Sequence, residues 1–149
     1  MNDLSQIPPL VGVLGLLVSF VIYAIVRSYD PGTDALKKIA DAIHEGAMVF
    51  MRREYSMLSM FAVVLLIGIY FTDGLGPKTA IAFLAGALSS MLAGWFGMYT
   101  ATQANVRTTT AAHNSGQAAA LSVAFFGGSI MGLAVASLGL MGLGLVYWY

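Results

Sequence analysis

The sequence predicts an all-α integral membrane protein, a bundle of four transmembrane helices with an interfacial amphipathic helix in the first connection. Three observations lead to this fold class. Hydrophobic residues make up 58% of the 149 residues and charged residues only 9%, which lies far from the composition of soluble domains. Four stretches are long enough to cross a bilayer, which takes about 20 apolar residues of helix. No aspartate or glutamate follows Asp73. We therefore expect one membrane domain over residues 1–149.

The four predicted spans share an absence of acidic and basic side chains, and they cover residues 7–26, 55–71, 79–104 and 118–149. We expect the first to be retained, because Asp3 stands where a signal peptide has basic residues and no small-x-small site precedes Arg27. The sequence has no cysteine, which excludes disulfides, thiolate metal sites and cysteine nucleophiles. A net charge of zero argues against a nucleic-acid partner.

The connection between the first two spans predicts a helix of its own over residues 33–54. A Pro-Gly pair breaks the first helix, and Thr33 or Asp34 can cap the next one. Its apolar side chains recur at helical spacing and its other face is charged, as in helices that lie on a membrane surface. We expect Gly46 to bend the chain into the second span. A lipid-binding module is the alternative, but the mixed charges favour a plain connector.

Basic residues are distributed unevenly between the two sides of the predicted bundle. One side has Lys78 alone, and the other has Arg27, Lys37, Lys38, Arg52, Arg53 and Arg107. Because basic residues near span ends stay in the cytoplasm, we expect both termini on the non-cytoplasmic side of a prokaryotic inner membrane. The outer connection would cover residues 72–78. The aromatic residues at 147–149 would then form a belt at the outer interface.

Small residues recur at every fourth position in the third and fourth spans. Such ladders let helix backbones approach closely, and close approach drives helix association in lipid. The predicted packing interface consists of Gly86, Ser90, Gly94, Gly97, Ala101, Gly128, Gly132 and Ala136. Two small faces on the third span imply neighbours on two sides, from this chain or from partner chains. Generic packing is favoured over a substrate-lined groove.

One group of side chains has the spacing of metal ligands. His44 follows Asp41 by three residues and is followed by Glu45. No second histidine lies near, and the His-Glu-x-x-His pattern is absent. We therefore interpret the group as a hydrated helix face and expect no metal site.

A polar run separates the third and fourth spans. Threonines at 108–110 follow Arg107 and could contact an anion at the start of the fourth span. We expect instead a polar turn, with Asn105 ending the third helix and Arg107 complementing its negative end. The glycines near Gly127 lie inside an apolar helix rather than after a strand, so we expect no phosphate-binding loop.

Three segments resemble one known family. Residues 97–108, with their Ala-Asn-Val-Arg-Thr run, and residues 127–133 resemble the third and fourth helices of membrane-integral pyrophosphatases, which pump ions at the expense of pyrophosphate. Residues 43–55 are similar to the start of that family's second helix. The similarity covers nearly the whole chain in order.

This resemblance implies a larger protein. Family members have sixteen spanning helices per subunit in an inner and an outer ring, work as homodimers, and place the four matched helices in the outer ring. Their acidic loops for magnesium pyrophosphate, their lysines and their ion-gate carboxylates lie on later helices, so no catalytic residue can be carried over. Magnesium and pyrophosphate are expected only if the missing helices complete the pump. The composition of the predicted spans agrees with this implication. Hydrolysis needs carboxylates for magnesium and ion transport needs an intramembrane acid, and the spans contain no acidic side chain.

Three functions follow from these observations. We favour a non-catalytic structural component that packs against other membrane chains in a larger complex. The alternative is the N-terminal part of a split or truncated proton- or sodium-translocating pyrophosphatase, active only with the missing helices. A free-standing transporter or enzyme has the least support, because the spans hold no acid.

Overall fold

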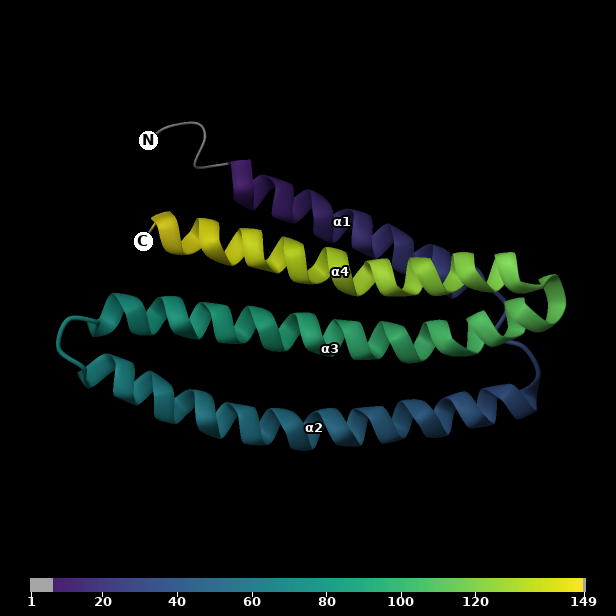
Figure 1. Ribbon diagram of the computed structural model, residues 1–149, viewed down its shortest axis with the longest axis horizontal. Helices are drawn as coiled ribbons and strands as arrows, with labels where there is room; N and C mark the ends of the chain where they lie inside the picture. The colour runs from purple at the N-terminus through teal and green to yellow at the C-terminus, as the bar shows by residue number, and fades with distance from the viewer. Residues whose placement is uncertain (1–6, 149) are drawn as a thin grey trace.

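The computed structural model describes residues 7–148, and no strand occurs among them. Four helices follow one another along the chain: α1 (Ile7–Ser28), α2 (Asp34–Phe71), α3 (Gly76–Ser115) and α4 (Gln117–Trp148) (Figure 1). Each helix is long and apolar enough to cross a membrane. The predicted all-helical membrane fold is therefore confirmed.

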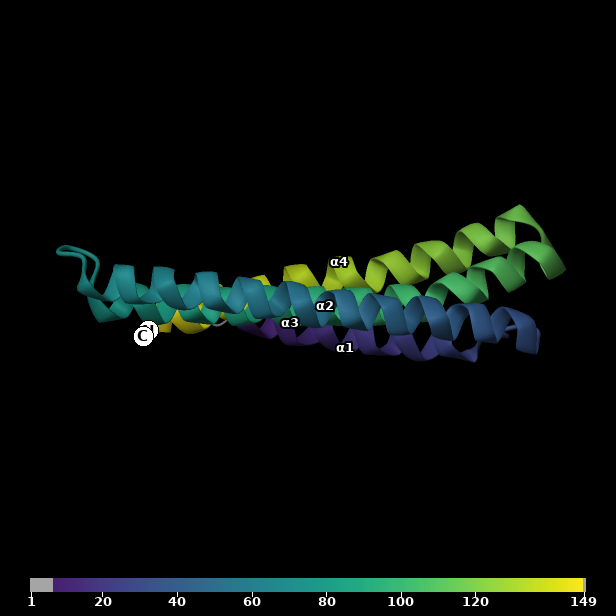
Figure 2. The ribbon, with the colours of Figure 1, turned by 90° about the horizontal axis from the view of Figure 1, so that it is seen from below.

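The helices lie side by side in the order α2, α3, α4, α1 (Figure 1). Within residues 7–148, α1 and α2 make no contact with each other, although they are neighbours in sequence. Figure 2 shows that the tip of the α3–α4 hairpin leans away from α1 and α2. The arrangement is an open layer rather than a closed bundle, so both broad faces are left for lipid or for other helices.

The first connection differs from the expected separate surface helix. A single helix, α2, runs from Asp34 to Phe71 and is uninterrupted at Gly46, with a gentle curve along its length (Figure 1). Thr33 provides the N-cap, and its side chain accepts a hydrogen bond of 3.4 Å from the Leu36 N–H. One glycine in a helix costs only about 1 kcal/mol, which packing along α3 can offset.

The expected turn after residue 104 is wrong, because α3 continues to Ser115. Each of the three threonines donates its hydroxyl to the carbonyl four residues earlier, as in Thr110 to Val106 at 3.0 Å. These bonds satisfy the side chains inside the helix, so the polar run needs no turn. Gly116 alone separates α3 from α4, and its φ of +84° is a conformation that glycine adopts without strain.

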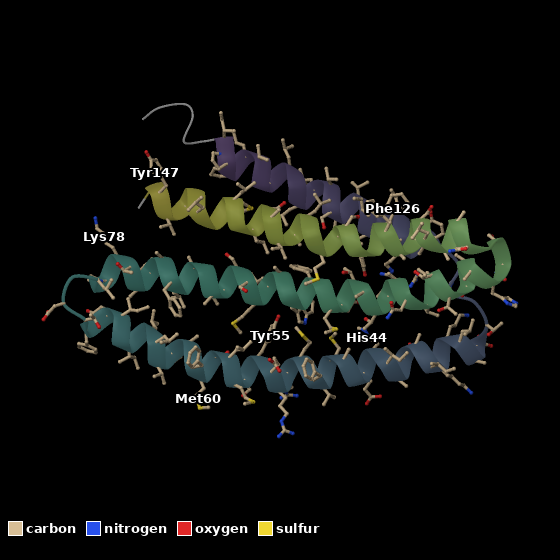
Figure 3. The ribbon with its side chains drawn as sticks, viewed as in Figure 1. His44, Tyr55, Met60, Lys78, Phe126 and Tyr147 are labelled. Carbon is tan, nitrogen blue, oxygen red and sulfur yellow. The ribbon has the colours of Figure 1, made fainter. Side chains whose placement is uncertain are left out.

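The connection between α2 and α3 is shorter than predicted. It covers residues 72–75, and α3 begins at Gly76 with a proline in its first turn. Proline suits this position because the first helical N–H groups lack helical partners anyway. Tyr147 and Lys78 both lie at this end of the molecule (Figure 3). The side chains of residues 148 and 149, also assigned to the aromatic belt, lie outside the part described.

Helix lengths show that part of the protein extends beyond the bilayer. At about 1.5 Å per residue, α1 is about 33 Å long and matches the hydrocarbon core of about 30 Å. The 38 residues of α2 and the 40 of α3 correspond to about 57 and 60 Å. The polar last turns of α3 and the charged first turns of α2 therefore project from the membrane together.

The buried core is small and lies where α1, α3 and α4 meet. Val26, Ala104 and Ile130 form its centre. By contrast, none of the most apolar 18-residue stretch of α2 is buried. Most of the apolar surface of this chain thus requires lipid or further helices to cover it.

Candidate functional site

The α2–α3 seam is fixed by a tyrosine and a glycine. Tyr55 points from α2 toward α3 (Figure 3), and its hydroxyl donates a 2.6 Å hydrogen bond to the Met91 carbonyl. Gly94 makes room for this side chain, since a Cβ there would lie 2.6 Å from the Tyr55 oxygen. Gly94, one of the predicted packing residues, therefore lies at a true helix contact.

The suggested metal group is divided between two environments. His44 points toward α3 (Figure 3), where its Nδ1 lies 2.7 Å from Thr102 Oγ1 and its ring meets Tyr99 edge-on at 5.2 Å. Asp41 and Glu45 are exposed. The interpretation as a wholly hydrated face was wrong for His44, which is half-buried against α3. No cluster of three metal-binding side chains occurs within residues 7–148.

Arg107 is the most deeply buried charge of the described chain. Only 7% of it is exposed. Its Nη1 donates to the Gln103 carbonyl at 2.7 Å and to the Gln103 side-chain oxygen at 3.4 Å, while its Nε is buried without a partner. Arg107 lies beyond predicted span 79–104. Burial lowers the pKa of its guanidinium from the ordinary value, and the charge of nearby Arg27 lowers it further.

The eight predicted packing residues fall into two groups. Gly97 and Gly94 lie at helix contacts; a Cβ on Gly97 would be 2.7 Å from the Met131 side chain. The others are exposed within this chain: Gly86, Ser90, Ala101, Gly128, Gly132 and Ala136. A Cβ at Gly86, Gly128 or Gly132 would meet nothing within 4 Å. The structure thus leaves most of the predicted interface open.

The contact face of α4 differs from the predicted ladder. It is formed by residues three or four apart, with a step of seven before the last: Val123, Gly127, Ile130, Ala134, Ser137 and Gly144. A Cβ at Gly127 would lie 2.6 Å from Ala104 of α3. This spacing is the seven-residue repeat of closely packed helices, which a search for every-fourth-residue ladders misses.

The α1–α4 seam was not predicted. Ser19 of α1 donates a 3.1 Å hydrogen bond to the Ile130 carbonyl of α4. Gly12 and Gly15 lie against Ser137, and an added Cβ on Gly12 would be 2.7 Å from the Ser137 carbonyl oxygen. Small residues three and seven apart in the first span (Gly12, Gly15, Ser19) were the signal that could have revealed this contact.

A groove of about 600 Å³ lies between the first half of α3 and the second half of α4. Its α3 wall contains the ladder Ala82, Gly86, Ser90 and Gly94, and its α4 wall contains Gly139 and Gly142. Three of the predicted packing residues of α3, Gly86, Ser90 and Gly94, therefore line an open groove. A wall of small residues at membrane depth is the surface that a further helix can approach closely.

Comparison with known proteins identifies the family. A family model described as inorganic H+ pyrophosphatase matches residues 13–149. A K(+)-insensitive pyrophosphate-energized proton pump of Methanosarcina mazei is 40% identical over 147 residues, which cover 99% of this chain and 22% of the pump. The proton pump of the same description from Pyrobaculum aerophilum is 38% identical over an alignment of 150 residues, which covers 95% of this chain and 20% of the pump.

The chain thus spans about one fifth of the length of the relatives it matches. The range matched by the family model includes the whole of α3 and α4 and the contacts between them described above. On this evidence the chain belongs to the inorganic H+ pyrophosphatase family.

Proposed function

We propose that these four helices form a non-catalytic packing layer of a larger membrane assembly, and that this assembly is a proton- or sodium-translocating pump energised by pyrophosphate. The observation that carries the proposal is the open groove between α3 and α4, with its wall of small residues. Lipid chains make few favourable contacts with such a wall, whereas another helix can bring its backbone into close contact with it.

The position of the carboxylates supports a non-catalytic role. The six acidic residues within the described chain are all exposed: Asp30, Asp34, Asp41, Glu45, Glu54 and Asp73. Magnesium pyrophosphate needs several carboxylates held around the metal, and an ion path through lipid needs an acid inside it. We infer that magnesium, pyrophosphate and the transported ion are bound by other parts of the assembly.

The relatives support the identity of the assembly. Proteins of this family named as pyrophosphate-energized proton pumps contain a similar segment within chains about five times as long. We propose that the partners of this chain are the helices that make up the remaining four fifths. By the distribution of its lysines and arginines, we place both termini on the non-cytoplasmic side of an inner membrane.

Co-expression with the remainder of the Methanosarcina mazei pump tests the proposal. The two parts should purify together in mild detergent and hydrolyse pyrophosphate in a magnesium-dependent manner, whereas neither part should do so alone. Co-purification with an unrelated membrane complex, without hydrolysis, would instead indicate a repurposed structural subunit.

A matched pair of variants tests the role of the groove. Gly86→Leu places a bulky side chain in the groove, while Gly68→Leu places the same side chain on α2, away from it. Neither position has an atom within 4 Å of an added Cβ, so both variants should fold as this chain does. Gly86→Leu should reduce assembly and hydrolysis together, and equal behaviour of the two variants would contradict the role of the groove.

A further inference from the structure

A second, separate pocket lies where α1 crosses α3 and α4. It has a volume of about 460 Å³. Its walls come from α1 (Leu16, Phe20, Tyr23) and α3 (Trp95, Phe96, Tyr99). The two hydroxyls deeper in the pocket are already used, since Ser19 bonds to the Ile130 carbonyl and Thr100 to the Phe96 carbonyl at 2.8 Å. The pocket therefore suits an apolar guest.

Basic side chains follow directly beyond one end of this pocket. Tyr23 of α1 and Thr100 of α3 both line the pocket. Arg27 is one helical turn beyond Tyr23 on α1, and Arg107 is seven residues, or two turns, beyond Thr100 on α3, so each arginine continues a helix face that lines the pocket. Val26, the neighbour of Arg27, packs in the core with Ala104, which lies one turn before Arg107 on α3. The two arginines therefore lie at the same level of the α1–α3 seam. Apolar lining thus gives way to two neighbouring positive charges.

Arg107 has donor capacity that this chain does not use. It is 7% exposed, its Nη1 donates only to Gln103, and its Nε is buried without a partner. A buried donor left unpaired costs about 1–3 kcal/mol, so the site favours an added acceptor. Guanidinium groups bind phosphate through two parallel hydrogen bonds.

The balance of charge around Arg107 is positive. A small pocket of about 90 Å³ joins Arg107 to Lys37 and also contains Asp41. The ammonium of Lys37 pairs with a different acid, Asp34, at 3.3 Å. Neither α3 nor α4 contributes any acidic side chain. With Arg27 included, the cations outnumber the carboxylate that faces them.

We propose that this surface binds an anionic phospholipid, with an acyl chain in the 460 Å³ pocket and the phosphate at Arg27 and Arg107. A phospholipid presents an apolar chain and a phosphate in the same order as the pocket and the two arginines. A protein helix could also fill the pocket, but a helix need not carry a negatively charged group. Basic pockets between transmembrane helices are known to bind anionic lipid head groups.

Native mass spectrometry of the full chain in detergent tests this site. Titration with phosphatidylglycerol should show a saturable bound molecule, and phosphatidylcholine should bind at least about tenfold more weakly. Loss of a charge-assisted hydrogen bond corresponds to about a tenfold change in affinity. Arg107→Gln and Arg27→Gln should each weaken phosphatidylglycerol binding by about that factor. Arg53→Gln removes the same charge from the exposed surface of α2 and should have no such effect.

A second pair of variants tests the apolar half without any change of charge. Leu16→Trp fills the pocket and should weaken phosphatidylglycerol binding, whereas Leu17→Trp, on the exposed side of α1, should not. Because Arg27 is exposed, its variant keeps the test decisive even if Arg107→Gln fails to fold.

Four outcomes would overturn the proposal. Equal binding of the two lipids would remove the role of the charge. If Arg27→Gln and Arg53→Gln changed the affinity for phosphatidylglycerol equally, the lipid would not bind at Arg27. Displacement of phosphatidylglycerol by millimolar inorganic phosphate, with Leu16→Trp silent, would indicate a site for free phosphate. Occupation of the pocket by a helix would appear as loss of lipid binding once the remaining pump helices are co-expressed.

Discussion

Two adjacent glycines of α4 allow a matched test of the helix packing. Gly127 faces α3, and a Cβ there would lie 2.6 Å from the Cβ of Ala104. Its neighbour Gly128 faces open space, with nothing within 4 Å of an added Cβ. Both atoms of the first contact are fixed to backbones, so no side-chain rotation can relieve it. In Gly127→Ala the two helices must move apart, and in Gly128→Ala they need not.

The expected difference can be worked out from two terms. Alanine is a better helix former than glycine by about 0.8–1.0 kcal/mol, and both variants gain this amount. Only Gly127→Ala also overpacks a tight contact, which costs about 1–3 kcal/mol. We therefore expect the free energy of unfolding of Gly127→Ala to be about 1–3 kcal/mol below that of Gly128→Ala. Helix propensity cancels in this comparison.

Reversible unfolding in mixed micelles, followed by circular dichroism, measures the difference. A second change provides a control, because Ala104→Gly removes the opposing methyl group. Ala104→Gly itself costs about 0.8–1.0 kcal/mol of helix propensity, so it should destabilise the Gly127→Ala background by less than it destabilises the unchanged chain. Equal stability of Gly127→Ala and Gly128→Ala, or an equal effect of Ala104→Gly in the two backgrounds, would refute the assigned α3–α4 contact.

Three further predictions concern two side-chain contacts and the orientation of the chain in the membrane. Tyr55→Phe removes the 2.6 Å bond to the Met91 carbonyl and should lower the free energy of unfolding by about 0.5–1.5 kcal/mol in the same assay. His44→Ala removes both the bond to Thr102 and the ring contact with Tyr99, each worth about 0.5–1.5 kcal/mol; His44→Phe should recover the ring contact only. Because the sequence has no cysteine, Lys38→Cys and Asp73→Cys each provide a unique thiol, and a membrane-impermeant maleimide added to intact cells should label only Asp73→Cys. Labelling of Lys38→Cys alone would reverse the proposed orientation.

The number and type of helices could be predicted from the sequence because the cost of unpaired backbone groups in lipid leaves few alternatives. Helix ends were harder to predict. The polar residues from Asn105 to Ser115 have the composition of a turn, yet threonine hydroxyls can bond within a helix, and α3 continues through them. Only Gly116, with its positive φ, breaks the helix.

The choice of packing face could not be read from the sequence of α4. This helix is apolar all round, so no polar side marks which residues face lipid. Gly127 and Gly128 are the same residue type, and only the position of Ala104 on α3 distinguishes them. The role of His44 depended in the same way on a residue far away in sequence, Thr102.

We propose that these four helices supply packing surface and no catalytic group to a pyrophosphate-energised pump. The decisive measurement is magnesium-dependent pyrophosphate hydrolysis by the purified chain reconstituted in liposomes, with and without the remaining helices of a related pump. We predict hydrolysis only when both parts are present. Hydrolysis by this chain alone would show that it contains a catalytic group.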